Sequence, residues 1–587
     1  MLLSKPSLLA ILAAALAIGS PIPETSEAVA TLDQPNPVYV SNAIVEDASS
    51  KTSLPILPTG ESMESPGPNI GQYGVWRSHM SESAATTDMA TLKRRGWSAT
   101  ERCQRELYYQ DGQCIEMINA TPYRWRRGYH HSSAVSAWEK RWPEYIEPGE
   151  VINVLAKMTN NGLFNTPEDS AAEVAYHIEG TDKPMSFMLE YRSGLPHVPW
   201  IRFLEDLEVM NHHKGAEFSL GGRMPPYGVP FILAGTEGDF VTNEGPAAWM
   251  QAQIDVLGDK PLREIVLGRS HHAGMWKTRG GLGGSWWNTA TQEATLYDQL
   301  RNGGARVLDA RIMRADGKFQ ECHGTIRDKT FLGSYGATFD ELIEQTNQFN
   351  EDYPGELIIW DIHPDEAFRF GVGEGNTIGM QFGSLNVTER ADFLELLKGL
   401  NHRISLPEDV DITKMPLKKF INSKDKKSAV IIRLDERWLE GVDMERWPGP
   451  SEGFVSSRQF PMTSTWSKKT DVKGMIEHQL QRMDEVGVSR TSEVYDMQWI
   501  QTLLGFGAVY PLGVSIISMA NESWDAAFRE LFNTLTADRY PNWLTMDAIQ
   551  NSEMKTLVMT MNHCFALERC GDWVNKRRQL ASERTDE

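Results

Sequence analysis

The sequence has 587 residues, far more than one ordinary hydrophobic core requires, and therefore predicts more than one domain. Its apolar fraction of 41% and charged fraction of 23% are typical of a globular protein. The formal net charge of −21 argues against a nucleic-acid-binding role, because a phosphate polymer is bound by a basic surface. The same charge argues against attachment to anionic lipid by electrostatics alone.

Residues 1–30 have the pattern of a secretory signal peptide. Lys5 gives a positive start, and residues 8–19 (LLAILAAALAIG) form a compact apolar stretch. The stretch is too short for a transmembrane helix, which needs about 20 apolar residues. Small residues at 19–20 and at 28–30 leave two cleavage points open. We therefore expect a secreted, extracellular protein without a transmembrane segment.

The five cysteines fit an oxidising compartment. Cys103 with Cys114, and Cys564 with Cys570, are spaced to close two short loops by disulfides. Cys322 falls inside a predicted strand and is expected to be a buried free thiol. The cysteine spacing does not favour a structural zinc site. Three sequons add glycosylation sites if the cell is eukaryotic: Asn119, Asn386 and Asn521.

Residues 31–115 are rich in Pro, Ser, Gly and Thr at first, and we interpret them as a linker or pro-region leading into an irregular cap. Residues 116–250 have a different sequence pattern, in which short strand-like runs alternate with Gly, Pro and Asn turns. This pattern is typical of a β-sandwich. The predicted strands are 175–180, 186–191, 200–204 and 230–234.

Three segments of this region resemble the fungal aegerolysin-type sandwich. They are residues 138–149 (WEKRWPEYIEPG), 177–181 (HIEGT) and 221–235 (GGRMPPYGVPFILAG). The resemblance implies a module that binds lipid or a membrane surface. A packing domain without a ligand fits the same residues equally well.

Residues 255–570 alternate between strands and helices. The predicted strands are 264–267, 306–312, 319–323, 356–362, 428–434 and 543–546. The predicted helices are 292–302, 338–351, 389–400, 473–486, 524–537 and 555–567. Such alternation favours parallel strands with crossover helices, and the length fits one TIM-type (β/α) barrel. A doubly wound sheet is the alternative, and residues 571–587 are expected to form a polar tail.

In a barrel, reactive side chains gather where strands end at the carboxyl face. Seven polar residues fall at the predicted ends of five strands: His271, His272, Asp309, Arg311, His323, His363 and Asp547. Single histidines at strand ends are usually structural, but seven polar groups at one face favour a site. Imidazoles beside an arginine suit acid–base chemistry on a phosphate diester, because a guanidinium binds phosphate oxygens.

Four motifs, in order, resemble the X region of phosphatidylinositol-specific phospholipases C. They are residues 265–274 (IVLGRSHHAG), 303–311 (GGARVLDAR), 322–324 (CHG) and 353–363 (YPGELIIWDIH). Residues 541–547 (PNWLTMD) resemble a later element of that family. The resemblance spans about 255–550 and implies a barrel that cleaves a phosphatidylinositol or related head group without a cofactor.

The resemblance also implies roles for single residues. His271 corresponds to the general base, and Asp547 to its orienting carboxylate. His323 corresponds to the general acid. Arg311 falls where metal-independent members carry the phosphate-binding arginine, and Asp309 would hold Arg311 or a substrate hydroxyl.

Two positions depart from the family pattern. His272 occupies a position that is Asp in bacterial-type members and Asn in calcium-dependent ones, and Arg269 with Ser270 replaces a Gly-Thr pair. His363 falls where bacterial members have lysine and calcium-dependent members glutamate. We therefore assign His272 and His363 to substrate binding, with the head group left open.

Trp286 and Trp287 follow the first strand in a glycine-rich stretch (GGLGGSWWNT). Trp is favoured at lipid–water boundaries, so both are assigned to a membrane-touching rim that binds substrate. Packing against the sandwich is the competing interpretation.

The sequence therefore predicts a secreted phosphodiesterase that acts on phospholipid at a membrane surface, without metal and without nucleic acid. One alternative is a metal-dependent phosphodiesterase on the same barrel, with His272, Asp309 and His363 as ligands. Arg311 argues against it, since a cation at that position repels a metal. The other alternative is a secreted lipid-binding protein whose barrel has no catalytic activity.

Overall fold

The computed structural model describes residues 112–136, 138–158, 171–192, 198–221, 227–280, 282–327, 330–363, 368–369, 383–441, 448–486, 493–503 and 514–585. The predicted signal peptide lies outside the described residues, as does the predicted linker and cap up to residue 111. Residues 112–115, which were assigned to that cap, begin the first strand of the sandwich.

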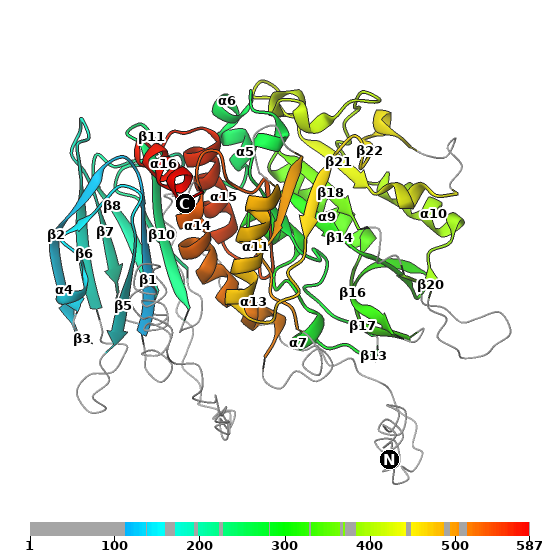
Figure 1. The fold of residues 1–587 in the computed structure, drawn as a ribbon, viewed down its shortest axis with the longest axis horizontal. Helices are drawn as coiled ribbons and strands as arrows, with labels where there is room; N and C mark the ends of the chain where they lie inside the picture. The colour runs from blue at the N-terminus through cyan, green and yellow to red at the C-terminus, as the bar shows by residue number, and fades with distance from the viewer. Residues whose placement is uncertain are drawn as a thin grey trace, which may run out of the picture. The chain divides into compact units, whose positions relative to one another are not determined.

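Two separate sheets form the amino-terminal part of the described chain (Figure 1). One sheet has the order β11-β10-β1-β5-β3, with β1 Gly112–Ala120, β3 Val135–Ser136, β5 Val151–Met158, β10 Gly228–Thr236 and β11 Asp239–Thr242. The other has the order β4-β2-β6-β7-β8-β9, with β2 Arg124–Ser133, β4 Tyr145–Ile146, β6 Ala171–Glu179, β7 Met185–Tyr191, β8 Pro199–Glu205 and β9 Glu217–Ser219. A short helix, α4 (Trp138–Arg141), follows β3.

The two sheets share one buried core. Trp125 and Phe187 of the second sheet contact Phe231 of the first, with ring centroids 5.0 Å apart for Trp125–Phe187 and 4.8 Å for Phe187–Phe231. Inner faces that interdigitate in this way define a sandwich. Three of the four predicted strands lie within observed strands, and the fourth, 175–180, extends one residue beyond the end of β6.

The carboxyl-terminal part is built on an eight-stranded sheet in which every ladder is parallel. The order is β22-β21-β18-β14-β12-β25-β24-β23. The strands are β12 Leu267–Ser270, β14 Val307–Ala310, β18 Leu357–Ile362, β21 Ala429–Leu434, β22 Phe454–Ser456, β23 Met462–Thr465, β24 Val494–Gln498 and β25 Trp543–Met546. β18 and β21 are buried at every residue, as a sheet covered on both faces requires.

The order of the strands in the sheet distinguishes the predicted TIM-type barrel from a doubly wound sheet. The last strand, β25, pairs with the first, β12, and β23 lies at the far edge from β22. In a doubly wound sheet the strand that follows the reversal would instead lie beside the first strand. The sheet is therefore curled in the order of a barrel (Figure 1). No ladder joins β22 to β23 within the described residues, so closure of the barrel stays a prediction.

Helices alternate with these strands. The longer ones are α8 Leu296–Arg301, α9 Phe339–Asp352, α10 Val387–Leu397, α11 Val472–Val486, α13 Ile516–Ala526, α15 Glu553–Met561 and α16 Trp573–Thr585. Shorter ones are α5 Trp249–Ala252, α6 Ile254–Leu257, η3 Leu262–Glu264, α7 Trp286–Thr289, η4 Ile412–Lys414, η5 Leu417–Lys419, η6 Glu436–Leu439 and η8 Pro450–Glu452. Side chains at the N-caps fix several starts, since Thr338 and Asn386 accept from the backbone N–H groups of Glu341 and Glu389.

Two predicted barrel strands differ from the structure. The first, 264–267, overlaps β12 only at Leu267, and residue 264 belongs to η3. The second is wrong. Residues 319–323 belong to β16 (Lys318–Arg327), which is antiparallel to both β15 (Ile312–Ala315) and β17 (Thr330–Thr338). The same sheet holds β13 Leu282–Gly283, β19 Phe368–Arg369 and β20 Gly383–Ser384. The reason is the two-residue turn Asp316-Gly317, in which both residues have positive φ and which therefore closes a tight hairpin.

The helix predicted over 524–537 is also not continuous. α13 ends at Ala526, a π-helical turn (η9) spans Ala527–Leu531, and α14 (Phe532–Thr534) completes the segment. A second π-helical turn, η10 (Asn562–Ala566), follows α15. Arg529, inside η9, pairs through Nε with Glu116 Oε1 of β1 at 2.9 Å, so this irregular helix contacts the sandwich.

The two parts share a continuous core, because Ile118 and Ile232 of the sandwich pack in the same buried cluster as Leu267 and Leu557. The predicted polar tail departs from expectation, since residues 573–585 form α16 and its first residue, Trp573, is buried in this cluster. No helix of the described residues combines the length and the apolar character that spanning a membrane would need.

The cysteine predictions are confirmed where the structure describes them. Cys564 and Cys570 form a disulfide, and Cys322 is a buried free thiol. Cys114 is disulfide-bonded, while its predicted partner, Cys103, lies outside the described residues. Glycosylation at Asn119 is contradicted, because its amide is fully buried and donates to the carbonyl oxygens of Tyr123 and Ile146.

Candidate active site

His271 lies beside Asp547 because of strand register. β12 and β25 are parallel, with Ser270 opposite Met546, so the next residue of each strand, His271 and Asp547, lies at the same carboxyl edge. His271 Nδ1 is 2.7 Å from Asp547 Oδ1. Burial raises the pKa of Asp547, although His271 opposes this shift. With Nδ1 donating to the carboxylate, Nε2 of His271 is the ring nitrogen left to accept a proton.

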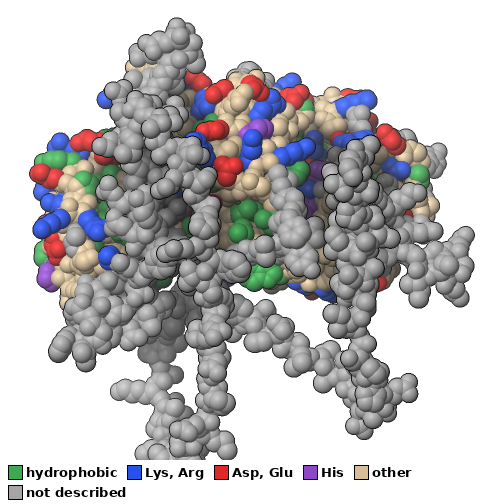
Figure 2. Space-filling model, turned by 60° about the horizontal axis from the view of Figure 1, so that its bottom comes forward, with side chains coloured by type: hydrophobic (Ala, Val, Ile, Leu, Met, Phe, Trp, Pro, Cys, Tyr) green, Lys and Arg blue, Asp and Glu red, His purple; other side chains and the backbone are tan. Residues whose placement is uncertain are grey.

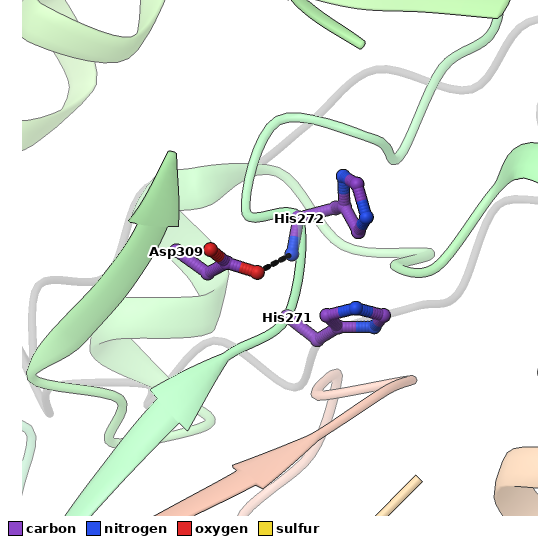
Figure 3. Close-up of side chains that lie close together, drawn as sticks. All are labelled: His271, His272 and Asp309. Atoms are coloured by element: carbon purple, nitrogen blue, oxygen red, sulfur yellow. Dashed lines mark hydrogen bonds between the residues drawn. The ribbon is translucent and has the colours of Figure 1, made fainter. Parts of the chain in front are cut away.

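His272 has a left-handed backbone, with φ of 42°, and its ring centroid lies 4.5 Å from that of His271. Its backbone N–H donates to Asp309 Oδ2 at 3.2 Å (Figure 3). Its ring Nδ1 lies 2.9 Å from the carbonyl oxygen of Cys322. Burial, and then the charge of Arg311, hold the pKa of His272 well below its ordinary value. The ring is therefore neutral, and its buried Nε2 has no hydrogen-bond partner among the described residues.

His323 completes a cluster of three imidazoles. Its ring centroid is 4.1 Å from that of His272 and 6.1 Å from that of His271. Nδ1 of His323 lies 2.9 Å from the carbonyl oxygen of Thr289, in α7. Burial and the neighbouring His271 lower its pKa to about 3. The expected proximity to His271 is present, but His323 lies within the antiparallel β16 and not at the end of a parallel strand.

Asp309 and Arg311 form an ion pair at the edge of this cluster. Arg311 Nη2 lies 3.1 Å from Asp309 Oδ2, and the backbone N–H of Arg311 donates to Glu321 Oε1 at 2.9 Å. Asp309 Oδ1 accepts from Arg269 Nη2 at 2.9 Å. Burial opposes ionisation of Asp309, yet the two guanidinium groups hold its pKa far below the usual range. Asp309 is therefore a carboxylate whose two oxygens are both occupied.

His363 directly follows β18, as expected. Its backbone N–H donates to the carbonyl oxygen of Ala310 at 2.9 Å, which fixes it beside the end of β14. Burial and the charge of Arg311 lower the pKa of His363 to about 4. The guanidinium of Arg311 therefore lies near enough to the His363 ring to disfavour its protonation.

Trp286 and Trp287 lie in α7, the short helix that also supplies the carbonyl group of Thr289 to His323. Their side chains are 37% and 51% exposed. α7 lies against α13, on the lower side of Figure 1. Figure 2 brings that side forward and shows hydrophobic side chains gathered near the middle of this face. The two indoles are therefore exposed beside the histidine cluster.

Sequence reasoning missed four charged residues beneath the cluster: Arg269, Asp361, Arg433 and Asp496. Each lies in a parallel strand, and β18 and β21 are otherwise apolar and buried. A lone charge in such a run was the available signal, because a charge is rarely buried unless it is paired.

Three donor atoms of His271, His272 and Asp309 lie within 4.8 Å of one another, a spacing that a metal ion requires (Figure 3). The donor set does not fit a divalent cation in this arrangement. Both oxygens of Asp309 already accept hydrogen bonds from arginine, and Arg311 adds a positive charge beside them. A cation at this point would be repelled.

Comparisons with known proteins give a limited likeness. No protein-family model matches the sequence, and no curated protein matches it. Solved structures include phosphatidylinositol-specific phospholipase C from Staphylococcus aureus, with 14% identity, a TM-score of 0.37, and coverage of 54% of this chain and 98% of that chain. The enzyme of the same name from Listeria monocytogenes has 16% identity, a TM-score of 0.34, and the same coverage.

Proposed function

We propose that this protein is a phosphodiesterase that cleaves a phospholipid head group, phosphatidylinositol or a related lipid, by histidine acid–base catalysis without a metal. One observation carries the proposal. A histidine oriented by a buried carboxylate, His271 with Asp547, lies beside a second set of imidazoles and the guanidinium of Arg311. We also infer that the curled sheet closes as a TIM-type barrel, since its strands follow one another in barrel order.

His271 acts as the general base. Its Nε2 takes the proton from a hydroxyl of the head group, and that oxygen forms a bond to phosphorus. Asp547 stabilises the imidazolium that results, because the carboxylate accepts from Nδ1. The base therefore becomes charged next to a group of opposite charge.

His323 acts as the general acid. Its Nδ1 faces a neutral carbonyl oxygen, and the low pKa of its ring means that the proton is held weakly. A bound phosphate diester places a negative charge beside the ring and raises its pKa. The protonated Nε2 then transfers its proton to the leaving oxygen as the bond from that oxygen to phosphorus breaks.

Arg311 stabilises the phosphate. A guanidinium donates to phosphate oxygens and gains strength as their charge grows in the transition state. Asp309 accepts from the Nε and Nη2 edge of Arg311, at 3.2 and 3.1 Å, and thus orients the group. His272 and His363 line the same region, and His272 offers its Nε2 lone pair to a substrate hydroxyl.

The lipid part of the proposal rests on exposed residues. Trp286 and Trp287 form a rim that enters the membrane interface, where the amphipathic indole ring is favoured. The sandwich, whose segments resemble the aegerolysin type, would add a second lipid contact. The amino-terminal pattern supports secretion, which places such an enzyme at outer membrane surfaces.

A metal-dependent phosphodiesterase is the second candidate, favoured only by the close donor atoms of His271, His272 and Asp309. For Asp309 to bind a metal ion, its ion pair with Arg311 would have to break.

A lipid panel with and without chelator tests both functions. The intact protein is mixed with vesicles that contain phosphatidylinositol, phosphatidylcholine or phosphatidylethanolamine, and water-soluble phosphate esters and diacylglycerol are measured. We expect release from phosphatidylinositol or a related inositol lipid, unchanged by EDTA. Complete loss with EDTA and recovery with calcium or magnesium would favour the second candidate. If no lipid yields a phosphate ester or diacylglycerol, the barrel has no catalytic activity on this panel. Lipid binding by the sandwich would then be the favoured function.

A further inference from the structure

A row of alternating charges crosses the parallel sheet directly beneath the histidine cluster. Arg433 Nη1 lies 2.7 Å from Asp361 Oδ1, and Asp361 Oδ2 lies 2.7 Å from Arg269 Nη2. The same Nη2 lies 2.9 Å from Asp309 Oδ1, and Asp309 Oδ2 lies 3.1 Å from Arg311 Nη2. Four of the five side chains are buried, and Arg311, at 12% exposed, is the most open of them.

Strand register creates this row. Asp309 of β14 lies opposite Asp361 of β18, and Asp361 lies opposite Arg433 of β21, so the three side chains emerge at one level. Two carboxylates therefore meet side by side, where like charges repel strongly because the interior is dry. Arg269, from β12, lies between them and donates to both.

The surroundings of Arg269 consist of oxygen atoms. In addition to Asp309 and Asp361, its Nη1 lies 3.7 Å from Asp496 Oδ2 and 3.4 Å from Thr545 Oγ1. Three carboxylates and a hydroxyl around one positive centre are the kind of donors that calcium and magnesium prefer. Here the positive centre is a guanidinium supplied by the chain itself.

We propose that Arg269 is a positioning residue that serves as an internal counter-cation, fixing Asp309 so that Arg311 and the backbone N–H of His272 keep their orientation toward a bound anion. Asp309 links these groups, since Oδ1 accepts from Arg269 while Oδ2 accepts from Arg311 and from His272. The inference relies on the proposed function only for the nature of the anion, and the charge row exists independently of it.

The test replaces the guanidinium and measures two binding events that need no turnover. In Arg269→Met, inorganic phosphate affinity, measured by calorimetry, should fall at least tenfold, because Asp309 no longer holds Arg311. The vacated oxygen donors should also take up calcium. The thermal midpoint of Arg269→Met should therefore rise saturably with calcium at constant ionic strength, whereas that of the unaltered protein should not.

Arg306→Met is the matched control. Arg306 is another fully buried arginine, paired with Glu356 at 2.6 Å, and it has no contact with Asp309 among the described residues. Its loss also leaves a buried carboxylate unpaired, so it should lower stability without weakening phosphate binding. If Arg306→Met loses phosphate affinity or gains a calcium response to the same degree as Arg269→Met, the positioning role of Arg269 is wrong.

A charge-balanced variant keeps the test decisive if Arg269→Met does not fold. Arg269→Met/Asp361→Asn removes one charge of each sign, and we expect it to fold and still to bind phosphate at least tenfold more weakly. Unaltered phosphate affinity in this variant would overturn the inference. Because both probes are simple ions, the result stands even if no lipid is cleaved, which separates failure of this inference from failure of the proposed function.

Discussion

The Nδ1 atoms of His271 and His323 face different acceptors, and this difference supports the proposed roles of base and acid. A carboxylate accepts from His271, so a proton gained at Nε2 is stabilised there. A neutral carbonyl oxygen lies opposite Nδ1 of His323, and burial lowers the pKa of its ring to about 3, so a proton at Nε2 is readily lost. Acid–base cleavage of a phosphate diester requires one group that accepts a proton and another that donates one.

The first prediction follows from these roles. His271→Ala and His323→Ala should each lower turnover of the lipid by roughly 10²–10⁴-fold, because each removes one proton transfer. With a diester that has an acidic phenol as leaving group, the loss in His323→Ala should largely disappear, since such a leaving group needs no proton. The loss in His271→Ala should persist.

His131→Ala is the control, because His131 is an exposed histidine on β2 of the sandwich. It should leave both substrates unaffected. Equal losses in His271→Ala and His323→Ala on the phenol ester would contradict the assignment of base and acid.

At the scale of elements, α7 connects the exposed rim to the site. Its four residues, Trp286–Thr289, carry two exposed indoles at one end and the carbonyl group of Thr289, which faces His323, at the other. A membrane that takes up the indoles would therefore lie close to His323, the proposed general acid. This arrangement would place a lipid head group at the histidine cluster.

The second prediction concerns this helix. Replacing Trp286 and Trp287 together with Ala should weaken binding to phosphatidylcholine vesicles by at least roughly tenfold, because two large apolar side chains leave the interface. Turnover of a short-chain, monomeric substrate should stay within about twofold. Sedimentation of vesicles measures the first quantity, and a soluble assay the second.

Tyr129→Ala is the matched control, since Tyr129 is 59% exposed on β2 and belongs to the sandwich. If Tyr129→Ala weakens vesicle binding as much as the double tryptophan variant, the sandwich also contacts lipid. If the tryptophan variant binds vesicles normally, the rim assignment is wrong.

At the scale of the whole molecule, the buried histidines make stability depend on pH. Burial depresses the pKa of His272, His323 and His363, the last two to about 3 and about 4. The unfolded chain binds protons at an ordinary histidine pKa near 6.5, so between these values it holds more protons than the native state. Stability is therefore full above about pH 6.5 and decreases as the pH falls toward 4.

The third prediction is a measurement of this dependence. The urea midpoint should fall between pH 7 and pH 4.5, and His323→Gln/His363→Gln should flatten the curve because two of the depressed groups are removed. The raised pKa of Asp547 acts in the opposite direction, which makes the comparison of variants, and not the curve alone, the decisive result. Parallel curves for the two proteins would show that these histidines do not govern acid sensitivity.

Local sequence patterns predicted most of the elements. Apolar runs gave the strands that became β14, β18, β21 and β25, and helical periodicity gave α9 and α11 to within one or two residues. They failed at β16, because a strand pattern does not reveal whether the neighbouring strand is parallel or antiparallel. The turn Asp316-Gly317 was the local signal that a hairpin would form there.

For the candidate site, the sequence by itself determined which residues stand at the strand ends. His271, His363 and Asp547 directly follow parallel strands, and before His363 and Asp547 the apolar run ends where the backbone leaves the covered sheet. Only the tertiary structure decided which of them meet. Register set His271 beside Asp547, and the antiparallel insertion brought His323 to the cluster.

The charge row was likewise beyond the sequence. Arg269, Asp361 and Arg433 are isolated charges in separate strands, and nothing local tells which will be neighbours. Their pairing depends on how four strands align across the sheet, and a shift by one residue would turn each side chain to the other face. Composition and spacing therefore fixed the kinds of chemical group, while long-range register, which no local pattern encodes, decided their partners and the pKa values that follow.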